Sequence, residues 1–295
     1  MTVSGSMVTN AFTVDVEDWH HCILHDPAQW CKYEDRIVYS TTKLLDIIEE
    51  KGVRATCFVL GYVAALHPEL VKAIHDRGHE VATHGYNHQF IYNQTPQAFR
   101  ADLERSIRTI VEITGQRPLG YRAPFFSITN KSLWAYEVLT DMGFKYDSSV
   151  YPVLNHRYGL LSAPRFAHRV QTNGGASLLE LPLATARILG LNLPVGGGVY
   201  FRALPYWIFR MAWRHTLGEG QPLLFYMHPW EIDPDQPVME NIHPLFKARR
   251  YLNLRKAEKK LHTLLSDFKF APVRDVFGHR LHPAHPQGGN EARRI

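Results

Sequence analysis

Three acidic residues, Asp15, Glu17 and Asp18, lie within four positions directly after an apolar run. Carboxylates this close raise each other's pKa, so the cluster is costly unless a cation relieves the repulsion. A divalent metal ion and an arginine would both relieve it. One acid could then ligate the metal while another acts as general base on water. A solvated loop with capping acids is the competing interpretation.

A second candidate group is the pair His84 and His88, separated by Gly-Tyr-Asn directly after another apolar run. One helical turn here would place both imidazoles on the same side. Two neutral imidazoles and one carboxylate suit zinc or a similar divalent ion. Surface or core histidines are the competing interpretation, because 17 histidines make this spacing common by chance. Two other pairs share the spacing: His21/His25, a lesser metal candidate, and His75/His79, which we interpret as surface histidines at a helix end.

Two more polar clusters follow later apolar runs. Arg122 could orient Asp15 through a bidentate contact, and the turn after it could hold the backbone amide of Phe125 as an oxyanion donor. His228 could be the general acid for a leaving group, and Trp230 could stack on a sugar ring. The competing interpretations are a surface ion pair for Arg122 and a plain loop for the turn at Phe125. For His228 and Trp230 they are a hydrogen-bonded buried histidine and an aromatic ring that covers the core.

Each cluster directly follows a predicted β-strand, and predicted helices lie between the strands. The predicted strands are residues 11–16, 54–60, 80–83, 119–122, 178–181 and 223–227. The predicted helices run from a Ser40 cap to Gly52, over 68–77, from a Thr95 cap to Gly115, from a Thr129 cap to Gly143, and over 254–268.

This alternation predicts a parallel sheet or an α/β barrel, in which chemistry gathers at the carboxyl ends of the strands. The four clusters would then meet on one rim. We expect a single domain over residues 10–275, with tails at 1–9 and 276–295. Residues 152–177 and 190–222 are rich in Gly, Pro and Asn, and we interpret them as long loop decorations.

The composition is that of an ordinary globular protein: 295 residues, 45% hydrophobic and 21% charged. The net charge of +5 comes mainly from basic residues near the C-terminus, and a solvated helix face explains it better than nucleic acid. Three cysteines are too few for a disulfide framework. Without an apolar run of membrane-spanning length or a signal peptide, we expect a cytoplasmic protein, with a membrane-associated biosynthetic complex as the alternative. The sequence makes no prediction of the oligomeric state.

Together the clusters resemble the polysaccharide deacetylases of the NodB-homology type over residues 10–275. The branch they resemble most is found with bacterial exopolysaccharide and exosortase (PEP-CTERM) loci. Five stretches carry the resemblance: FTVDVEDW at 12–19, RATCFVLG at 54–61, YRAPFFSI at 121–128, DSS at 147–149 and FYMHPWE at 225–231.

The resemblance implies a distorted (β/α) barrel with about seven strands and a metal-dependent removal of acetyl groups from N-acetylated sugars. The roles it implies are Asp15 as base, His84 and His88 as metal ligands, Arg122 orienting Asp15, the Phe125 amide facing the oxyanion, His228 as acid, and Asp147 in a supporting, substrate-side role. The expected metal is Zn²⁺, with Co²⁺ or Ni²⁺ as alternatives.

This sequence departs from the family at one point. The usual first motif has two adjacent aspartates, base and then ligand, but here Val16 follows Asp15. The metal-binding carboxylate is therefore Glu17 or Asp18. Relatives with an Asp-x-Asp version favour Glu17, whereas the shorter aspartate side chain favours Asp18, and both alternatives stay open at this point.

The main hypothesis is a metal-dependent deacetylase acting on amino sugars of an exopolysaccharide or its precursor. A second hypothesis keeps the machinery and changes the substrate to a small amide, as in allantoinase-like relatives. A third is a catalytically silent carbohydrate-binding relative, which would bind sugar without releasing acetate. The expected partner in the first case is an N-acetylated polysaccharide or oligosaccharide, and no nucleic acid.

Overall fold

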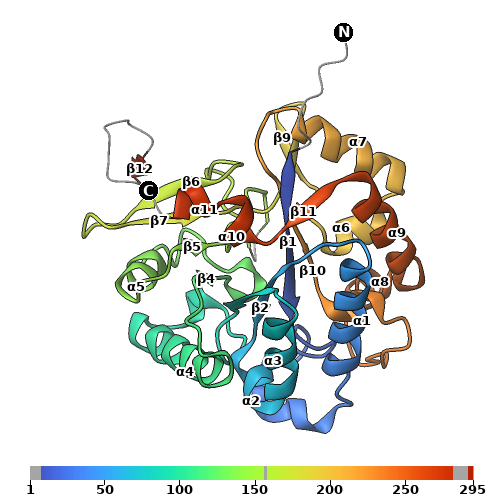
Figure 1. Ribbon diagram of the computed structural model, residues 1–295, viewed down its shortest axis with the longest axis horizontal. Coiled ribbons are helices and arrows are strands. Elements are labelled where there is room, and N and C mark those ends of the chain that lie inside the picture. Colours follow the sequence, from blue (N-terminus) through green and yellow to red (C-terminus); the bar gives the residue numbers. More distant parts are fainter. Residues whose placement is uncertain (1–7, 156–157, 282–291, 295) are drawn as a thin grey trace.

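The structure is a computed structural model that describes residues 8–155, 158–281 and 292–294 (Figure 1). Seven strands lie side by side and parallel. In spatial order they are β10 (Leu224–Met227), β1 (Thr9–Val16), β2 (Thr56–Val59), β3 (Glu80–Thr83), β4 (Gly120–Tyr121), β5 (Tyr146–Asp147) and β7 (Ser177–Glu180). The predicted α/β barrel with about seven strands is thus confirmed.

Three more strands extend this sheet. Strand β6 (His168–Gln171) runs antiparallel to β7, β12 (Ala292–Arg294) pairs with β6, and β11 (Lys269–Ala271) pairs with the start of β1. The path of described strands runs from β10 to β12 without closing on itself. The sheet is therefore a curled, open barrel.

Alternation along β1 explains how the barrel is filled. Phe12, Val14 and Val16 belong to the large apolar core outside the sheet, whereas Ala11 belongs to the core inside the curl. Because side chains alternate between the faces of a strand, Asp15 shares the inner face with Ala11. A polar residue therefore enters the barrel at the carboxyl end of β1.

Helices cover the outer side of the curl (Figure 1). The main covering helices are α1 (Ile37–Glu49), α3 (Pro68–Asp76), α4 (Pro96–Thr114), α5 (Ala135–Asp141) and α9 (Leu254–Asp267). Shorter helices are α2 (Gly61–Leu66), α6 (Gly198–Ala203) and α8 (Pro244–Tyr251). Two more, α10 (Val273–Val276) and α11 (Gly278–Leu281), pack against the core inside the curl. Helix α4 has the predicted bounds: Thr95 caps it, accepting from the Ala98 N–H, and Gly115 ends it with φ +68°.

The predicted loop decorations are largely structured. Residues 190–222 include α6 and α7 (Tyr206–Leu217), whose Phe201, Phe209 and Trp213 lie in the main core. Strand β9 (Leu191–Pro194) pairs with β8 (Thr185–Ile188) in a separate hairpin. The glycines and prolines lie mainly in the connections. Because they are numerous, the i, i+4 spacing of the apolar face of α7 was not recognised from the sequence.

Two predicted helix starts were wrong. Helix α1 begins at Ile37, three residues before the proposed Ser40 cap, because the Asp18 carboxylate accepts hydrogen bonds from the Arg36 and Ile37 N–H groups. Helix α5 begins at Ala135, well after Thr129. In α1 the capping group comes from a distant segment, so a local pattern cannot reveal it.

The expected tails fall partly outside the described residues, namely at 1–7 and 282–291. The nearer part of the C-terminal tail is ordered. Phe277 and Leu281 are buried inside the curl beside Val273. Residues 276–281 thus pack with the domain. Among the described helices, none has the length and apolar character needed to cross a membrane.

Candidate active site

The four polar clusters meet at the carboxyl ends of β1, β3, β4 and β10, as the sequence predicted, around a cavity of about 450 Å³. Its charged and histidine lining residues are Asp15, Glu17, His84, His88, Arg202, His228, Glu231, Arg249 and Arg250. Its other lining residues include Cys22, Phe125, Phe126, Asn155, Tyr158, Val199, Tyr226, Trp230 and Phe246.

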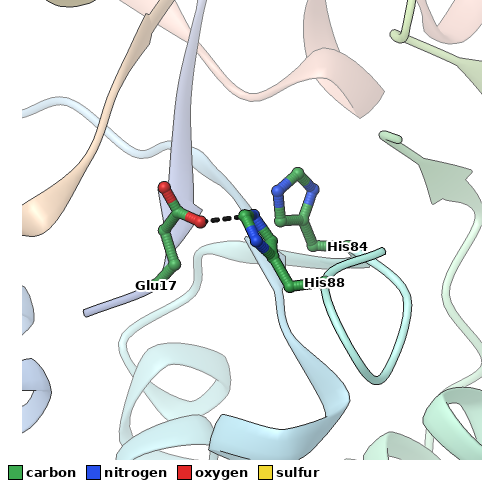
Figure 2. A group of neighbouring side chains, drawn as sticks. All are labelled: Glu17, His84 and His88. Carbon is green, nitrogen blue, oxygen red and sulfur yellow. Dashed lines mark ion pairs between the residues drawn. The ribbon is translucent and has the colours of Figure 1, made fainter. Parts of the chain in front are cut away.

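Glu17, His84 and His88 form a buried group whose ligand atoms all lie within 4.8 Å of one another (Figure 2). Glu17 Oε2 lies 2.5 Å from His88 Nε2, outside hydrogen-bond geometry. Burial alone would raise the pKa of Glu17, but the imidazoles of His88, His228 and His84 hold it below its usual range. The group offers one carboxylate and two imidazoles facing a common point.

Backbone contacts orient both histidines. His84 Nδ1 lies 2.8 Å from the Arg122 carbonyl oxygen and donates to it, which leaves Nε2 as the free nitrogen. Burial lowers the pKa of His84 to about 4, so its imidazole is neutral near pH 7. His88 has a left-handed backbone, with φ +52°, directly after the turn at Gly85. This conformation costs a non-glycine residue about 1 kcal/mol or more, and here it occurs at the pocket.

Asp15 is held by a buried arginine. Arg122 Nη1 donates to Asp15 Oδ1 at 2.5 Å and to Thr13 Oγ1 at 3.0 Å, while Nε and Nη2 donate to the carbonyl and hydroxyl of Ser148. The Arg122 guanidinium is fully buried and lies 4.1 Å from the centre of the Phe58 ring. Both side chains are therefore fixed, and Asp15 Oδ2 is directed toward His228 Nε2, 4.0 Å away.

His228 is held in the same way from the opposite side. Its Nδ1 donates to Glu231 Oε1 at 2.8 Å, and Arg202 Nε donates to Glu231 Oε2 at 2.6 Å. Burial would raise the pKa of Glu231, but Arg202 and His228 lower it to about 2. His228 Nε2 lies 3.2 Å from Glu17 Oε1. Burial opposes a charged imidazole, yet Glu17 and Glu231 outweigh it and raise the pKa of His228.

The aromatic side of the pocket comes from the short turn Pro124–Phe126. Phe125 and Phe126 both have positive φ, +57° and +52°. The Phe125 ring stacks on Phe90 with centroids 4.1 Å apart and lies 4.5 Å from the ring of His88. The ring thus covers the histidine pair, and the role of the Phe125 amide stays a prediction.

The structure separates the two alternatives for the third ligand. Residues two apart on an extended chain share a face, and Glu17 turns toward the pocket with Asp15. Asp18 turns away: its oxygens accept from the N–H groups of Trp19, Arg36 and Ile37. Burial raises the pKa of Asp18 to about 6. Asp18 is therefore the cap of α1 and lies outside the His84/His88 group.

One member of each of the other histidine pairs, His21 and His79, has a structural role. His21 Nδ1 accepts from the Asp18 N–H, and its ring packs on Trp30 with centroids 4.2 Å apart. The interpretation of His79 as a surface residue was wrong, because it is buried, accepts from the Ala55 N–H and lies 2.8 Å from Glu49. A spacing pattern cannot distinguish these roles from metal binding.

Two predicted substrate-side residues, Asp147 and Trp230, are almost completely buried. Asp147 is fully buried beneath the pocket, where it accepts from the Ser149 hydroxyl, which in turn accepts from the Ala123 N–H. Its role here is to support the turn after Arg122. Trp230 lines the pocket but is only 5% exposed, because it stacks on His228 and lies under the Arg250 guanidinium. Little of its ring is free for a sugar.

Sequence reasoning missed several pocket residues. Glu231, next to Trp230, appeared only as part of a motif. Arg202, Arg249 and Arg250 lie in segments interpreted as a decoration or a solvated helix. No local signal marks them, because their partners are distant: Arg202 Nη1 donates to the carbonyls of Arg250 and Leu252.

Comparison with known sequences agrees with this geometry. The profile described as polysaccharide deacetylase matches residues 26–146. A second profile, described as a domain of unknown function (DUF3473), matches residues 148–278. Residues 26–146 thus match a polysaccharide deacetylase domain, and the DUF3473 match follows it directly. The pocket draws on both matched segments, and Asp15 and Glu17 lie just before the first.

The chain spans about a third of the length of the curated relatives it matches. It is 35% identical to a peptidoglycan deacetylase of Helicobacter pylori over 108 residues, 37% of this chain and 36% of that protein. It is 29% identical to chitin deacetylase 2 of Saccharomyces cerevisiae over 119 residues, 39% of this chain and 37% of that protein.

Two solved structures share the fold. One, from Mycobacterium smegmatis and assigned to the polysaccharide deacetylases, has a TM-score of 0.62 at 22% identity, over 98% of this chain and 97% of that chain. Another is a CE4 family pseudoenzyme from Bacillus anthracis, with a TM-score of 0.50 at 13% identity, over 98% of this chain and 70% of that chain. The fold thus occurs in a protein described as inactive, so activity must be argued from the site.

Proposed function

We propose that this protein is a metal-dependent hydrolase that removes acetyl groups from N-acetylated sugars of a polysaccharide. The observation that carries the proposal is the meeting of three groups in one cavity: Glu17 with the histidine pair, Asp15 fixed by Arg122, and His228 fixed by Glu231. A silent binding protein would not need two buried arginines to hold a carboxylate and an imidazole at these positions.

The residues present fit a divalent metal. Glu17 Oε2 and His88 Nδ1 are buried without a hydrogen-bond partner among the described residues, which is costly unless another group satisfies them. One carboxylate and two neutral imidazoles are the donor set of an open zinc site, and Co²⁺ or Ni²⁺ suits the same donors. When bound, the metal supplies Lewis acidity, which polarises the acetyl carbonyl and acidifies water.

Asp15 has the position of a general base. Arg122 occupies Oδ1 and orients the carboxylate, so Oδ2 can accept the proton of an attacking water. Because Thr13 and Ser148 also bind Arg122, the guanidinium stays at Oδ1 when Oδ2 takes up the proton.

His228 has the position of a general acid. Glu231 accepts from Nδ1, so the proton available for transfer is on Nε2, which faces the cavity. Transfer from Nε2 to the leaving nitrogen would release the free amine. His228 Nε2 lies 4.0 Å from Asp15 Oδ2, so the acid and the base we propose can act on the same substrate group.

The substrate we propose is an N-acetylated exopolysaccharide or its precursor. Support comes from the relatives, whose names specify peptidoglycan and chitin deacetylases, and from the motif resemblance to the exopolysaccharide-associated branch. The cavity of about 450 Å³ is open enough for a sugar residue within a chain.

The test combines metal content with acetate release. We expect the purified protein to hold about one divalent metal per chain and to release acetate from N-acetylated oligosaccharides. The His84→Ala/His88→Ala variant should lose both. A protein that stays metal-free after exposure to zinc, cobalt and nickel, or that binds sugar without releasing acetate, would contradict the proposal. Release from small amides but not from sugars would favour the allantoinase-like alternative.

A further inference from the structure

One wall of the pocket carries an excess of positive charge. Arg202, Arg249 and Arg250 line it, and the only carboxylate on this wall among the described residues is Glu231. Across the cavity, Arg122 already balances Asp15. The cavity thus has four arginines in or beside it and three carboxylates, before the charge of any bound metal is added. All three wall arginines lie in the segment matched by the DUF3473 profile.

Arg250 is a buried cation that forms no ion pair with a carboxylate of the described residues. It is 4% exposed, its Nη2 donates to the Trp19 carbonyl, and its guanidinium lies 3.1 Å from the centre of the Trp230 ring. Its Nε has no hydrogen-bond partner among the described residues. Burying an unpaired charge is unfavourable, so a fixed guanidinium beside a cavity is suited to an anion from outside.

Arg249 adds a second, more accessible cation. It lies on α8, directly before Arg250, and its Nη2 is 3.5 Å from the Tyr158 hydroxyl. Its guanidinium lies 5.7 Å from the centre of the Tyr200 ring. No carboxylate of the described residues pairs with it. The two tyrosines hold the side chain over the pocket without neutralising it.

We infer that Arg249 and Arg250 form an anion subsite, which binds a carboxylate or phosphate of the substrate next to the acetylated sugar. This inference rests on the proposed function and adds a substrate class to it: the polymer or precursor is acidic. A neutral polymer would leave the buried Arg250 guanidinium without a counter-charge, whereas a carboxylate or phosphate can accept hydrogen bonds from both arginines.

The test is a binding measurement on the purified full chain, by calorimetry at low salt. Three probes separate the alternatives: chitotetraose is neutral, a hyaluronan tetrasaccharide carries carboxylates, and UDP-N-acetylglucosamine carries a diphosphate. We expect at least one anionic probe to bind about tenfold more tightly than chitotetraose, with a preference that weakens as salt is raised. The preferred probe identifies a uronic acid or a phosphate as the natural group.

The variant that tests the site is Arg249→Gln, because Arg249 is exposed and its loss should leave the fold intact. It should remove most of the anionic preference, Arg249→Lys should keep part of it, and Arg214→Gln, an exposed arginine on α7 outside the pocket, should keep all of it. Equal affinity for all three probes, or a preference unchanged in Arg249→Gln, would overturn the inference.

The binding readout also separates this inference from the proposed function. A protein that releases acetate from chitotetraose but shows no anionic preference would refute the subsite alone. A protein that shows the preference and never releases acetate with metal bound would keep the subsite and refute the deacetylase.

Discussion

Two groups of buried acids lie in the same barrel and have opposite character. Asp15 and Glu17 face the cavity beside basic side chains: Arg122 binds Asp15, while His88 and His228 lie beside Glu17. Asp147 and Glu180 are register partners on β5 and β7, fully buried, and neither lines the pocket. Their partners are mostly hydroxyl and backbone N–H groups.

The second group is held by uncharged donors. The Tyr136 hydroxyl and the Val150 N–H donate to Glu180, and Ser149 donates to Asp147. Burial, together with the neighbouring Asp147, raises the pKa of Glu180 well above its usual range, and burial also raises the pKa of Asp147. Two adjacent carboxyl groups without a cation can share a proton, but they cannot both ionise cheaply.

The difference shows what turns a buried acid into a reactive one. Burial is common to both groups, so burial alone does not identify a catalytic carboxylate. The partners decide: an arginine holds one oxygen of Asp15 and leaves the other toward the cavity, whereas hydroxyl donors fix Asp147 and Glu180 as structural links between strands.

The largest expected effect comes from removing the charge at the cavity. Glu17→Gln should lose tight metal binding, because an amide oxygen is a much weaker zinc ligand than a carboxylate. Asp18→Asn, the matched control one position away, should bind metal as the wild type does. Metal content by elemental analysis decides, and metal loss in Asp18→Asn with retention in Glu17→Gln would reverse our assignment.

The second effect is on turnover. Asp15→Asn should lower kcat by at least about a hundredfold with the metal retained, since the amide cannot accept the proton. His228→Ala should have an effect of similar size through the leaving group. Asp147→Asn is the control from the other group, and its kcat should stay near wild type. Near-wild-type turnover in Asp15→Asn or His228→Ala would refute the role given to that residue.

A third prediction concerns the buried pair Asp147 and Glu180 and the pH dependence of the free energy of unfolding. A raised pKa in the folded state means that the wild type loses stability as pH rises from the ordinary glutamate value toward the raised one. Glu180→Gln removes this loss, so its unfolding free energy should gain on that of the wild type as pH rises from 5 to 8.

Urea denaturation at both pH values measures this difference. Asp26→Asn is a suitable control, because Asp26 is an exposed aspartate at the surface. A constant difference between Glu180→Gln and wild type across this range would show that Glu180 is ionised in the folded protein.

The smallest expected effect is on stability, and it distinguishes Asp18 from the pocket residues Asp15 and Glu17. Asp18→Ala should lower the unfolding free energy by about 1–3 kcal/mol, because three backbone N–H groups lose their acceptor. Its metal content should not change. Thermal melting with and without zinc tests both parts, and a melting temperature equal to that of the wild type would contradict the capping role.

The sequence by itself determined the parallel strands, helix α4 and the rim of the barrel on which the four clusters meet. These features depend on local order: apolar runs, the Thr95 cap and Gly115 stop, and the rule that parallel strands end on one side. The same local order placed Asp15, His84, Arg122 and His228 together.

Only the tertiary structure decided which neighbouring residue does what. Val16 separates Asp15 from Glu17, and the direction of each side chain at the end of β1 sends Glu17 to the histidines and Asp18 to α1. The arginines of the positive wall come from segments far along the chain from Asp15. Their effect is electrostatic and depends on distance in space, which spacing along the chain does not encode.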